Sequence, residues 1–557
     1  MNFSKISPKS LLLLILVLGL TLRIINLTIG FPMLYLSNDE AVYHLSALNM
    51  IANKTLFSLG NYGPLGSYLQ LPFLALAYLV LFISGKVSSF ADMELLLTAQ
   101  EGYFMFIPRI LSALFGTLTI LSIYRLSIVL FKNKSAALWS SFFTAVSFNL
   151  VHVSHFARSL SPALFFTTLA VLFAVENTQD TKREFKNILF SFVFSAIAFG
   201  FHQVMGIVVI FPLIIALRKL HLKDFSKGIL IHLFMWFALI IVFNYLSLGG
   251  NILQIFRSNN ALGVALIRTP DFWLTKNFDQ IVSTLILSIK MFWYLILAEG
   301  VILGFSIYGF IKAKIITKIR LAFAVFFLIS MILSIFVFPP VLRYFLPTIV
   351  FVPLFAGVAS QRLLNRKNIL LALVVILVAS FNSLYWNYLM TKEPTFVQMR
   401  KWLDKNIPPE TPIAATFYRT VGYVPSRNAS APIRKFRPGY YLRAANLIGD
   451  NNYPYNVRNI LYLESFKKSS KTESLKTGYR VFSMEYIVDA YYSEQDRLIN
   501  SSNNLALVTH FSATGDNIHT KRIPELFADT INVFPLFVLD RPGPYFDILK
   551  VKNDKKH

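Results

Sequence analysis

Long apolar runs alternate with short polar connections over the first 390 residues of this chain. The apolar runs lie at residues 11–25, 69–83, 107–131, 136–151, 162–175, 188–200, 204–217, 229–246, 285–311, 321–338, 344–359 and 369–389. A helix of about 20 apolar residues is long enough to cross the hydrocarbon core of a bilayer. The pattern therefore predicts a polytopic α-helical membrane protein with about 11–13 transmembrane helices.

The polar connections are of two kinds, which alternate along the chain. One kind is rich in Lys and Arg and lies at residues 132–134, 182–186, 218–227, 312–320 and 362–367. The other kind lies at residues 152–161, 200–203, 249–283 and 339–343. Since positively charged loops stay in the cytoplasm, we expect the first kind there, together with the N-terminus, in a plasma (inner) membrane. An odd number of crossings then places the C-terminal part on the extracytoplasmic side.

Residues 30–106 form the first extracytoplasmic loop in this interpretation. The helix at 107–131 must run inward to Lys132, so both ends of the loop lie outside. The apolar segment 69–83 therefore either lies in the interface or crosses the bilayer together with a second, weaker stretch within 87–106. The sequence leaves both possibilities open.

The pattern changes after residue 390. Phe396, Met399 and Leu403 recur at helical spacing, and Pro408-Pro409 ends that helix. Short β-rich runs follow at residues 412–418, 480–492, 505–513 and 545–551, separated by Asn, Gly and Pro clusters. We expect a transmembrane domain at residues 1–390 and an extracytoplasmic α+β domain at residues 391–557.

Composition supports a membrane protein and removes two kinds of site. Hydrophobic residues make up 55% of the chain and the mean hydropathy is +0.57, whereas soluble domains contain about 45–50% apolar residues. Without cysteine, the chain can form neither disulfides nor thiolate metal sites. Lys and Arg outnumber Asp and Glu by 29 to 12 in residues 1–390 and by 24 to 16 in residues 391–557. Cytoplasmic loops account for most of the first excess, so the net charge of +25 does not indicate nucleic-acid binding.

An acidic pair, Asp39-Glu40, follows the first apolar run in a region with few carboxylates. The next residues, with Leu45 and Leu48, form an amphipathic segment that would hold the pair near the bilayer surface. A carboxylate in that place can act as a general base and accept a proton from a hydroxyl. The structural alternatives are a solvated loop pair and an N-cap for the helix expected at 41–52.

Three arginines, Arg109, Arg158 and Arg343, fall at the outer ends of apolar segments. The planar guanidinium donates paired hydrogen bonds and therefore suits phosphate. Cations are also needed where charge develops on a phosphate leaving group. The alternative role of each arginine is an anchor that reaches from the helix end to the interface.

Four further residues are candidates for contact with substrate or with a buried partner. Tyr43 and Tyr62 could stack on a sugar ring, and His155 lies at the same level as the arginines. His155 could also satisfy local hydrogen bonds, and no carboxylate stands near it to complete a metal site. Glu299 lies within an apolar run, where a carboxylate is costly; it could line a cavity or pair with Lys290.

Several segments resemble motifs of the GT-C superfamily of glycosyltransferases. The closer resemblance is to the branch that holds the dolichyl-phosphate-mannose protein mannosyltransferases and the aminoarabinose transferases that modify lipid A. The matching segments are Asp39-Glu40 with Tyr43 and Ala47, Pro64-Leu65 with Tyr68, Arg109 to Gly116, Ser154 to Arg158, Arg343 to Pro347, and Trp402-Leu403 with Ile407-Pro408. Together they cover most of residues 10–410.

The resemblance implies a GT-C fold and an inverting transfer of a sugar from a polyprenyl-phosphate donor to a hydroxyl acceptor, which is a protein, a lipid or a glycan. Carried over by position, it makes Asp39 the base and Glu40 the residue that orients acceptor or donor. It places Arg343 and Arg158 at the lipid phosphate. His155 departs from the branch, which has Arg at this position, and this departure leaves the identity of the sugar open.

Two other functions fit parts of the sequence. A transporter or flippase for lipid-linked sugars would also span the membrane, but such proteins carry inverted repeats and paired broken helices, which the sequence does not show. A ligase-type envelope protein that handles lipid-linked glycans would need outer arginines without depending on Asp39-Glu40. The chain contains no Asp-x-Asp pair, so the transferase is expected to need no metal cofactor.

Overall fold

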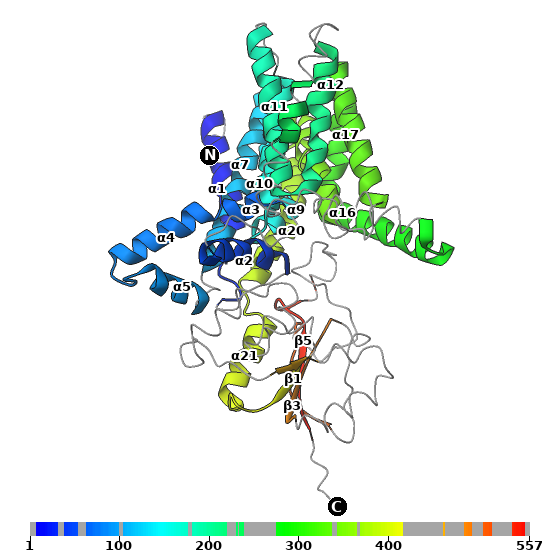
Figure 1. Cartoon of the computed structure of the whole chain (residues 1–557). Helices are drawn as coiled ribbons and strands as arrows, with labels where there is room; N and C mark the ends of the chain where they lie inside the picture. The colour runs from blue at the N-terminus through cyan, green and yellow to red at the C-terminus, as the bar shows by residue number, and fades with distance from the viewer. Residues whose placement is uncertain are drawn as a thin grey trace, which may run out of the picture. The chain divides into compact units, whose positions relative to one another are not determined.

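The computed structural model folds into helices followed by a small β-sheet (Figure 1). It describes residues 7–31, 38–53, 63–99, 104–176, 181–219, 230–231, 233–238, 274–336, 342–364, 368–415, 460–462, 484–492, 505–514, 537 and 539–551. Backbone contacts group the chain into two units. Unit 1 contains Met1–Leu27, Val42–Phe73 and Ile107–Trp386, and unit 2 contains Thr28–Ala41, Leu74–Phe106 and Asn387–His557.

Unit 1 is helical. Its elements are α1 (Pro8–Ile24), α3 (Leu65–Tyr68), α7 (Phe106–Phe131), α8 (Lys134–Val146), α9 (Phe148–Ser154), α10 (Leu160–Val175), α11 (Thr181–Phe201), η2 (Gln203–Val209), α12 (Ile210–Lys219), α16 (Phe278–Lys312), α17 (Thr317–Phe336), η5 (Leu342–Phe345), α18 (Leu346–Ile349), α19 (Val352–Leu363) and most of α20 (Ile369–Met390). The helices α2 (Asn38–Asn53) and α4 (Leu71–Ile83) are also divided between the two units, as are the first residue of α7 and the last residues of α20, which belong to unit 2.

Six helices among the described residues are long and apolar enough to cross a membrane. They are Leu65–Ile83, Phe106–Phe131, Phe278–Lys312, Thr317–Ile335, Leu346–Leu363 and Ile369–Asn406. The bent pair α8 and α9 would make a seventh, and three shorter apolar helices accompany them. The predicted fold class, a polytopic α-helical membrane protein, is confirmed. The total of about 11–13 crossings stays a prediction, because parts of the chain lie outside the described residues.

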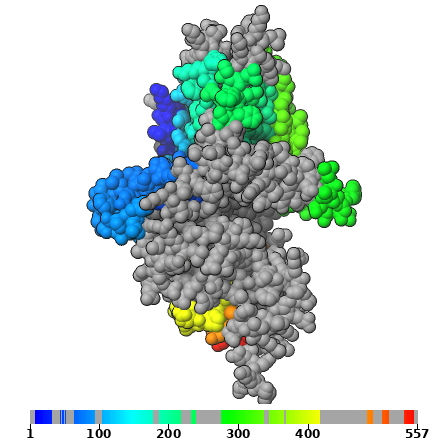
Figure 2. Space-filling view, in the orientation of Figure 1, coloured from blue at the N-terminus to red at the C-terminus, as the bar shows by residue number. Residues whose placement is uncertain are grey.

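The outer surfaces of these helices are apolar. Phe278 and Ile289 on α16 are largely exposed, as are Leu370 and Leu377 on α20. In Figure 2 the N-terminal end of α16, coloured green, projects from the other helices of unit 1. Soluble proteins rarely expose large apolar patches, whereas lipid chains cover such side chains at no cost.

Phenylalanine rings fill the core of unit 1. Phe323 of α17 packs edge-on against Phe211 of α12 and against Phe355 of α19, with ring centroids 4.7 and 5.1 Å apart. Small residues bring other helices together, as is usual where lipid removes the hydrophobic drive between helices. At Gly309 of α16 a Cβ atom would lie 1.9 Å from the carbonyl oxygen of Phe355.

The apolar run at 136–151, expected as one helix, is broken in the structure. α8 ends at Val146, and α9 starts at Phe148 with a bend of 54°. The broken pair exposes the last carbonyl groups of α8 and the first N–H groups of α9, which need partners other than their own helix. These partners come from α1, α16 and α20, as described for the site below.

Other boundaries also differ from the sequence pattern. The helix expected at 41–52 already starts at Asn38, so the pair Asp39-Glu40 lies in its first turn and not in a loop. The run at 344–359 divides into η5, α18 and α19, because Pro347 and Pro353 each lack an N–H donor and start new helices.

The segment expected to be interfacial or spanning forms two helices. Leu65–Ile83 is long enough to cross a membrane, and α5 (Phe90–Ala99) follows it with only ten residues. A helix needs about 20 residues to span, so α5 is too short to supply the second crossing within 87–106 by itself.

Unit 2 contains α21 (Thr395–Asn406) and a five-stranded sheet, and the predicted C-terminal α+β fold is confirmed. The strands are β1 (Ile413–Ala415), β2 (Ile460–Tyr462), β3 (Tyr486–Tyr491), β4 (Leu505–Phe511) and β5 (Tyr545–Val551), in the order β2-β1-β3-β5-β4. Thr395 at the start of α21 donates hydrogen bonds to the carbonyl oxygens of Pro542 and Pro544 next to β5. The strand β2 had no counterpart in the sequence pattern.

The close approach of α16 and α19 predicts a difference between two glycines on one helix. Gly309→Ala should lower the thermal stability of the purified protein in detergent, by roughly 1–3 kcal/mol, because the added methyl overpacks against backbone. Gly304→Ala is the matched control, since nothing lies within 4 Å of its Cβ position. Equal unfolding temperatures for the two variants would show that α16 and α19 do not pack as described.

Candidate functional site

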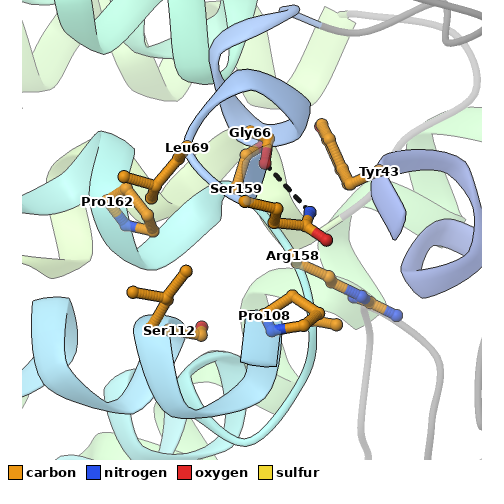
Figure 3. Close-up of a pocket in the computed structure, with 11 residues that line it drawn as sticks. Tyr43, Gly66, Leu69, Pro108, Ser112, Arg158, Ser159 and Pro162 are labelled. Carbon is orange, nitrogen blue, oxygen red and sulfur yellow. Dashed lines mark hydrogen bonds between the residues drawn. The ribbon is translucent and has the colours of Figure 1, made fainter. Parts of the chain in front are cut away.

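A small pocket lies within unit 1, where four separate segments meet (Figure 3). The pocket is partly open, and the empty space in and around it amounts to about 260 Å³. Its walls come from α2, the segment 66–70 and the start of α7. The fourth wall is the turn between α9 and α10, together with the first residues of α10. The lining residues are Tyr43, Gly66, Leu69, Gln70, Pro108, Leu111, Ser112, Ala157, Arg158, Ser159 and Pro162.

Gly66 makes the pocket narrow by letting backbone and rings approach closely. A Cβ atom at this position would lie 2.7 Å from Tyr43 and 2.9 Å from Ser159. The carbonyl oxygen of Gly66 accepts a hydrogen bond from Gln70 Nε2 at 3.0 Å, and Gln70 Oε1 lies 3.0 Å from Nδ1 of His44 on α2. These bonds tie the segment 66–70 to α2 and fix one wall of the pocket.

Arg158 is the one cation among the described residues that line the pocket. It is buried, and its guanidinium carbon lies 5.3 Å from the centre of the Phe156 ring. Figure 3 shows the side chain extending past Pro108, on the side of the pocket where α2 carries Tyr43. A buried cation among hydroxyl groups is suited to an anion, because charges attract more strongly where water is scarce.

The predicted acidic pair lies on the same helix as Tyr43. Asp39 and Glu40 occupy the first turn of α2, and Glu40 is fully buried. Tyr43 follows Asp39 and Glu40 by about one turn along α2. A carboxylate at a helix start, such as that of Glu40, is also favoured by the helix dipole, which gives Glu40 a structural role as well.

The structure does not bring Arg109 and His155 into the pocket lining. The Arg109 guanidinium is buried and donates a 2.7 Å hydrogen bond to the carbonyl oxygen of Leu27. His155 Nδ1 lies 2.9 Å from the carbonyl oxygen of Val151, so this nitrogen carries the proton, because a carbonyl can only accept. His155 thus makes the local bond that was its structural alternative, whereas the Arg109 bond joins α7 to the residue that follows α1 in sequence by three positions.

For three predicted site residues, the structure describes either the backbone alone or nothing. Arg343 is in η5 and Asp39 is in α2, but the positions of their side chains are not described. Tyr62 lies outside the described residues. The roles predicted for these residues stay predictions.

Glu299 has other partners than those expected from the sequence. Lys290 is exposed on α16, and the Glu299 carboxylate instead accepts hydrogen bonds from Ser147 and Asn149 at the break between α8 and α9. On the other side of the break, Arg23 of α1 donates to the carbonyl oxygens at the end of α8. The sequence analysis missed Arg23, although an arginine inside an apolar run is a signal of a buried partner.

Other pocket residues were also missed. Ser112, Ser159 and Gln70 line the pocket with polar groups. Ser112 and Ser159 stand inside segments that resemble family motifs or directly next to them, but small polar residues occur on many membrane helices, so no sequence signal separated them. The described residues contain no group of three His, Asp or Glu side chains arranged to hold a metal ion.

One family model matches the sequence. It is that of the dolichyl-phosphate-mannose-protein mannosyltransferases, and it matches residues 95–247. This stretch contains Arg109, His155 and Arg158, and it does not include Asp39 or Arg343. No match was found among curated proteins.

This chain is also similar to several solved structures, including these three. The apo oligosaccharyltransferase of Archaeoglobus fulgidus has 14% identity and a TM-score of 0.44, with 88% of this chain and 70% of that chain covered. ArnT of Cupriavidus metallidurans bound to undecaprenyl phosphate has 11% identity and a TM-score of 0.45, with coverage of 86% and 92%. The Pmt1-Pmt2 protein O-mannosyltransferase complex of S. cerevisiae bound to the sugar donor has 19% identity and a TM-score of 0.32, with coverage of 47% and 37%.

All three TM-scores are below 0.5, so the functional assignment depends on the family model and the site residues. The family model and the sequence motifs agree on the same branch. They agree also on the segment that carries Arg109 and Arg158. The resemblance of this chain to the dolichyl-phosphate-mannose-protein mannosyltransferases is therefore confirmed over residues 95–247.

Proposed function

We propose that this protein is a membrane glycosyltransferase that moves a sugar from a polyprenyl-phosphate-linked donor to a hydroxyl acceptor, with inversion. The observation that carries the proposal is the buried Arg158 in a pocket that also contains Tyr43. Tyr43 follows Asp39 by one helical turn. The turn between α9 and α10 would thus supply a phosphate-binding cation and α2 a general base, the two groups that the reaction requires.

The reaction follows as a single displacement. Asp39 accepts the proton of the acceptor hydroxyl, whose oxygen then attacks the anomeric carbon on the face opposite the phosphate. The bond between that carbon and the phosphate oxygen breaks, and the lipid phosphate leaves with the electron pair. Arg158, together with Arg343, stabilises the charge on the phosphate through charge-assisted hydrogen bonds. Glu40 orients the acceptor or the donor.

Arg109 and His155 have less direct roles in this proposal. Arg109 is bound to Leu27 and His155 to Val151, so we assign the principal phosphate contact to Arg158. The matching family is that of the dolichyl-phosphate-mannose-protein mannosyltransferases. Dolichyl-phosphate-mannose is a polyprenyl-phosphate sugar. This name supports the donor class, and the sugar and the acceptor (protein, lipid or glycan) are left open.

The reaction is proposed for the extracytoplasmic face of the plasma membrane. The support is the alternation of Lys- and Arg-rich connections, which places the N-terminus in the cytoplasm and the acidic pair outside. The same alternation gives an extracytoplasmic location for the C-terminal α+β domain, residues 391–557.

Replacement of the proposed base should abolish transfer. Asp39→Asn removes the proton acceptor and should lower the rate of sugar transfer from polyprenyl-phosphate hexose by about 10²–10⁴-fold without loss of expression. Asp92→Asn on α5 is the matched control, since that carboxylate accepts bonds from Ser88 and has no proposed role. Retained transfer by the Asp39→Asn protein would remove Asp39 from the mechanism.

Replacement of Arg158 should weaken both donor binding and leaving-group stabilisation. Arg158→Gln should lower the transfer rate by roughly 10²–10³-fold, and Arg158→Lys should lose less, because it keeps the charge but not the paired donors. Arg362→Gln, at the exposed end of α19, is the control. An Arg158→Gln protein with wild-type kinetics would show that the lipid phosphate binds elsewhere.

The reaction is expected to need no metal ion, because two arginines supply the positive charge at the leaving group. Transfer by the purified protein should therefore be unchanged after EDTA treatment. The measurement is the initial rate with and without the chelator. Loss of activity that Mg²⁺ or Mn²⁺ restores would contradict this expectation.

A further inference from the structure

Glu299 is buried in the middle of α16, and the mechanism proposed above does not use it. One carboxylate oxygen, Oε1, accepts three hydrogen bonds at the start of α9. The donors are the Ser147 hydroxyl at 2.8 Å, the Asn149 backbone N–H at 2.9 Å and the Asn149 side-chain amide at 2.9 Å. These three bonds join α16 to the start of α9, and each donor would lose its buried partner if the carboxyl group were removed.

The other half of the break is held by two different helices. Arg23 of α1 donates to the carbonyl oxygens of Thr144 and Ala145, both at 3.0 Å. The Ser383 hydroxyl of α20 donates to the carbonyl oxygen of Val146 at 2.7 Å. A cation thus meets the C-terminal end of α8, the favourable arrangement for that helix dipole, and the Glu299 carboxyl group meets the start of α9. The bend of 54° is fixed from both sides.

Short-range bonds join the segment that follows the break to α9. Within it, His155 is bonded to Val151, and the Ser154 hydroxyl donates to the carbonyl oxygen of Leu150 at 2.6 Å. The Arg158 guanidinium lies over the Phe156 ring, and Arg158 N donates to the Phe156 carbonyl oxygen at 2.7 Å. The direction of α9 therefore decides where the Arg158 side chain lies.

An aromatic cluster extends the same connection. Trp386 of α20 is fully buried, and its ring lies 4.9 Å from His152 and 6.4 Å from Phe156. α20 therefore supports α9 and the turn behind it, and the same helix supplies Ser383 to the break. Displacement of α9 at the Glu299 end would carry the turn at 155–159 away from the pocket wall formed by Pro108 and Ser112.

We propose that Glu299 is a positioning residue for Arg158. It anchors the start of α9 and thereby sets the place of the guanidinium in the pocket for the donor phosphate. The inference depends on the proposed function, because it assigns the ligand of Arg158 as the lipid phosphate. A displacement of about 1 Å in a binding group can lower a reaction rate on the order of 10²-fold. Loss of this anchor should therefore lower the affinity for the donor.

The test compares Glu299→Gln with Glu299→Met in the full-length protein. The Gln side chain keeps an Oε1 acceptor, and its affinity for undecaprenyl phosphate alone should stay within about threefold of wild type. The Met side chain fills a similar volume without an acceptor, and should weaken that affinity at least about tenfold and speed amide exchange over residues 148–158. Combined with Arg158→Gln, Glu299→Met should cause no further loss of affinity, because both act through the same group.

Asn382→Ala is the control for a merely structural effect. Asn382 of α20 donates to the carbonyl oxygen of Ala298, next to Glu299 on α16, and makes no bond to the break. In this variant, the affinity for the donor and the rate of amide exchange over residues 148–158 should both stay as in wild type. If Glu299→Met does not fold, Asn149→Ala is the second test. It removes one hydrogen-bond donor, leaves the carboxylate in place, and should weaken the affinity for undecaprenyl phosphate to a smaller extent. Unchanged affinity in a folded Asn149→Ala protein would overturn the inference.

Two results separate this inference from the proposed function. Wild-type donor binding together with unchanged affinity and exchange in Glu299→Met would overturn the positioning role and leave the transferase in place. Additive losses in the double variant would do the same. A wild-type protein that binds no undecaprenyl phosphate would overturn the proposed function, and the positioning role for its donor would fall with it.

Discussion

Hydrocarbon offers no hydrogen bonds, so a helix that breaks inside a membrane has to find partners for the backbone groups it frees. The break between α8 and α9 meets this constraint with an arginine, a serine and a glutamate from three other helices. Arg23 is fully buried for this purpose, and a Cβ atom at Gly116 would lie 2.9 Å from its Nε atom. The sharp turn in the chain is therefore a fixed feature of the bundle, and neighbouring residues are small where the charged side chain passes.

The candidate site follows from that turn. Without the break, the chain would continue along the axis of α8. The bend gives α9 a different direction, and α9 leads into the turn that holds Arg158 and Ser159. Gly66 then allows α3 to approach both this turn and Tyr43. Burial of a charge in a membrane is unfavourable in free energy, and charged residues in membrane helices are found mainly at functional sites. In the proposed function the buried charge is Arg158, and transfer from a polyprenyl-phosphate donor requires a cation at the phosphate.

Hydrophobic periodicity predicted the helices well, because a membrane-spanning helix must be apolar over its whole length. The limits of α7, α20 and β5 lie within a few residues of the expected ones. The break at Ser147 could not be predicted, since its cause is tertiary: partners on α1, α16 and α20 are distant in sequence. Arg158 was recognised as a phosphate candidate from its place at a helix end, and it does line the pocket. Arg109 shared that sequence signal but is bound to Leu27, a difference that only the fold decides.

The most direct test of the account is an experimental structure of the protein in lipid with undecaprenyl phosphate bound. The account predicts that the phosphate lies in the pocket between α2 and the turn at 155–159, with its oxygens about 2.7–2.9 Å from the Arg158 guanidinium nitrogens, as in charge-assisted hydrogen bonds. A phosphate bound at another place in the bundle, with the Arg158 pocket empty, would contradict it.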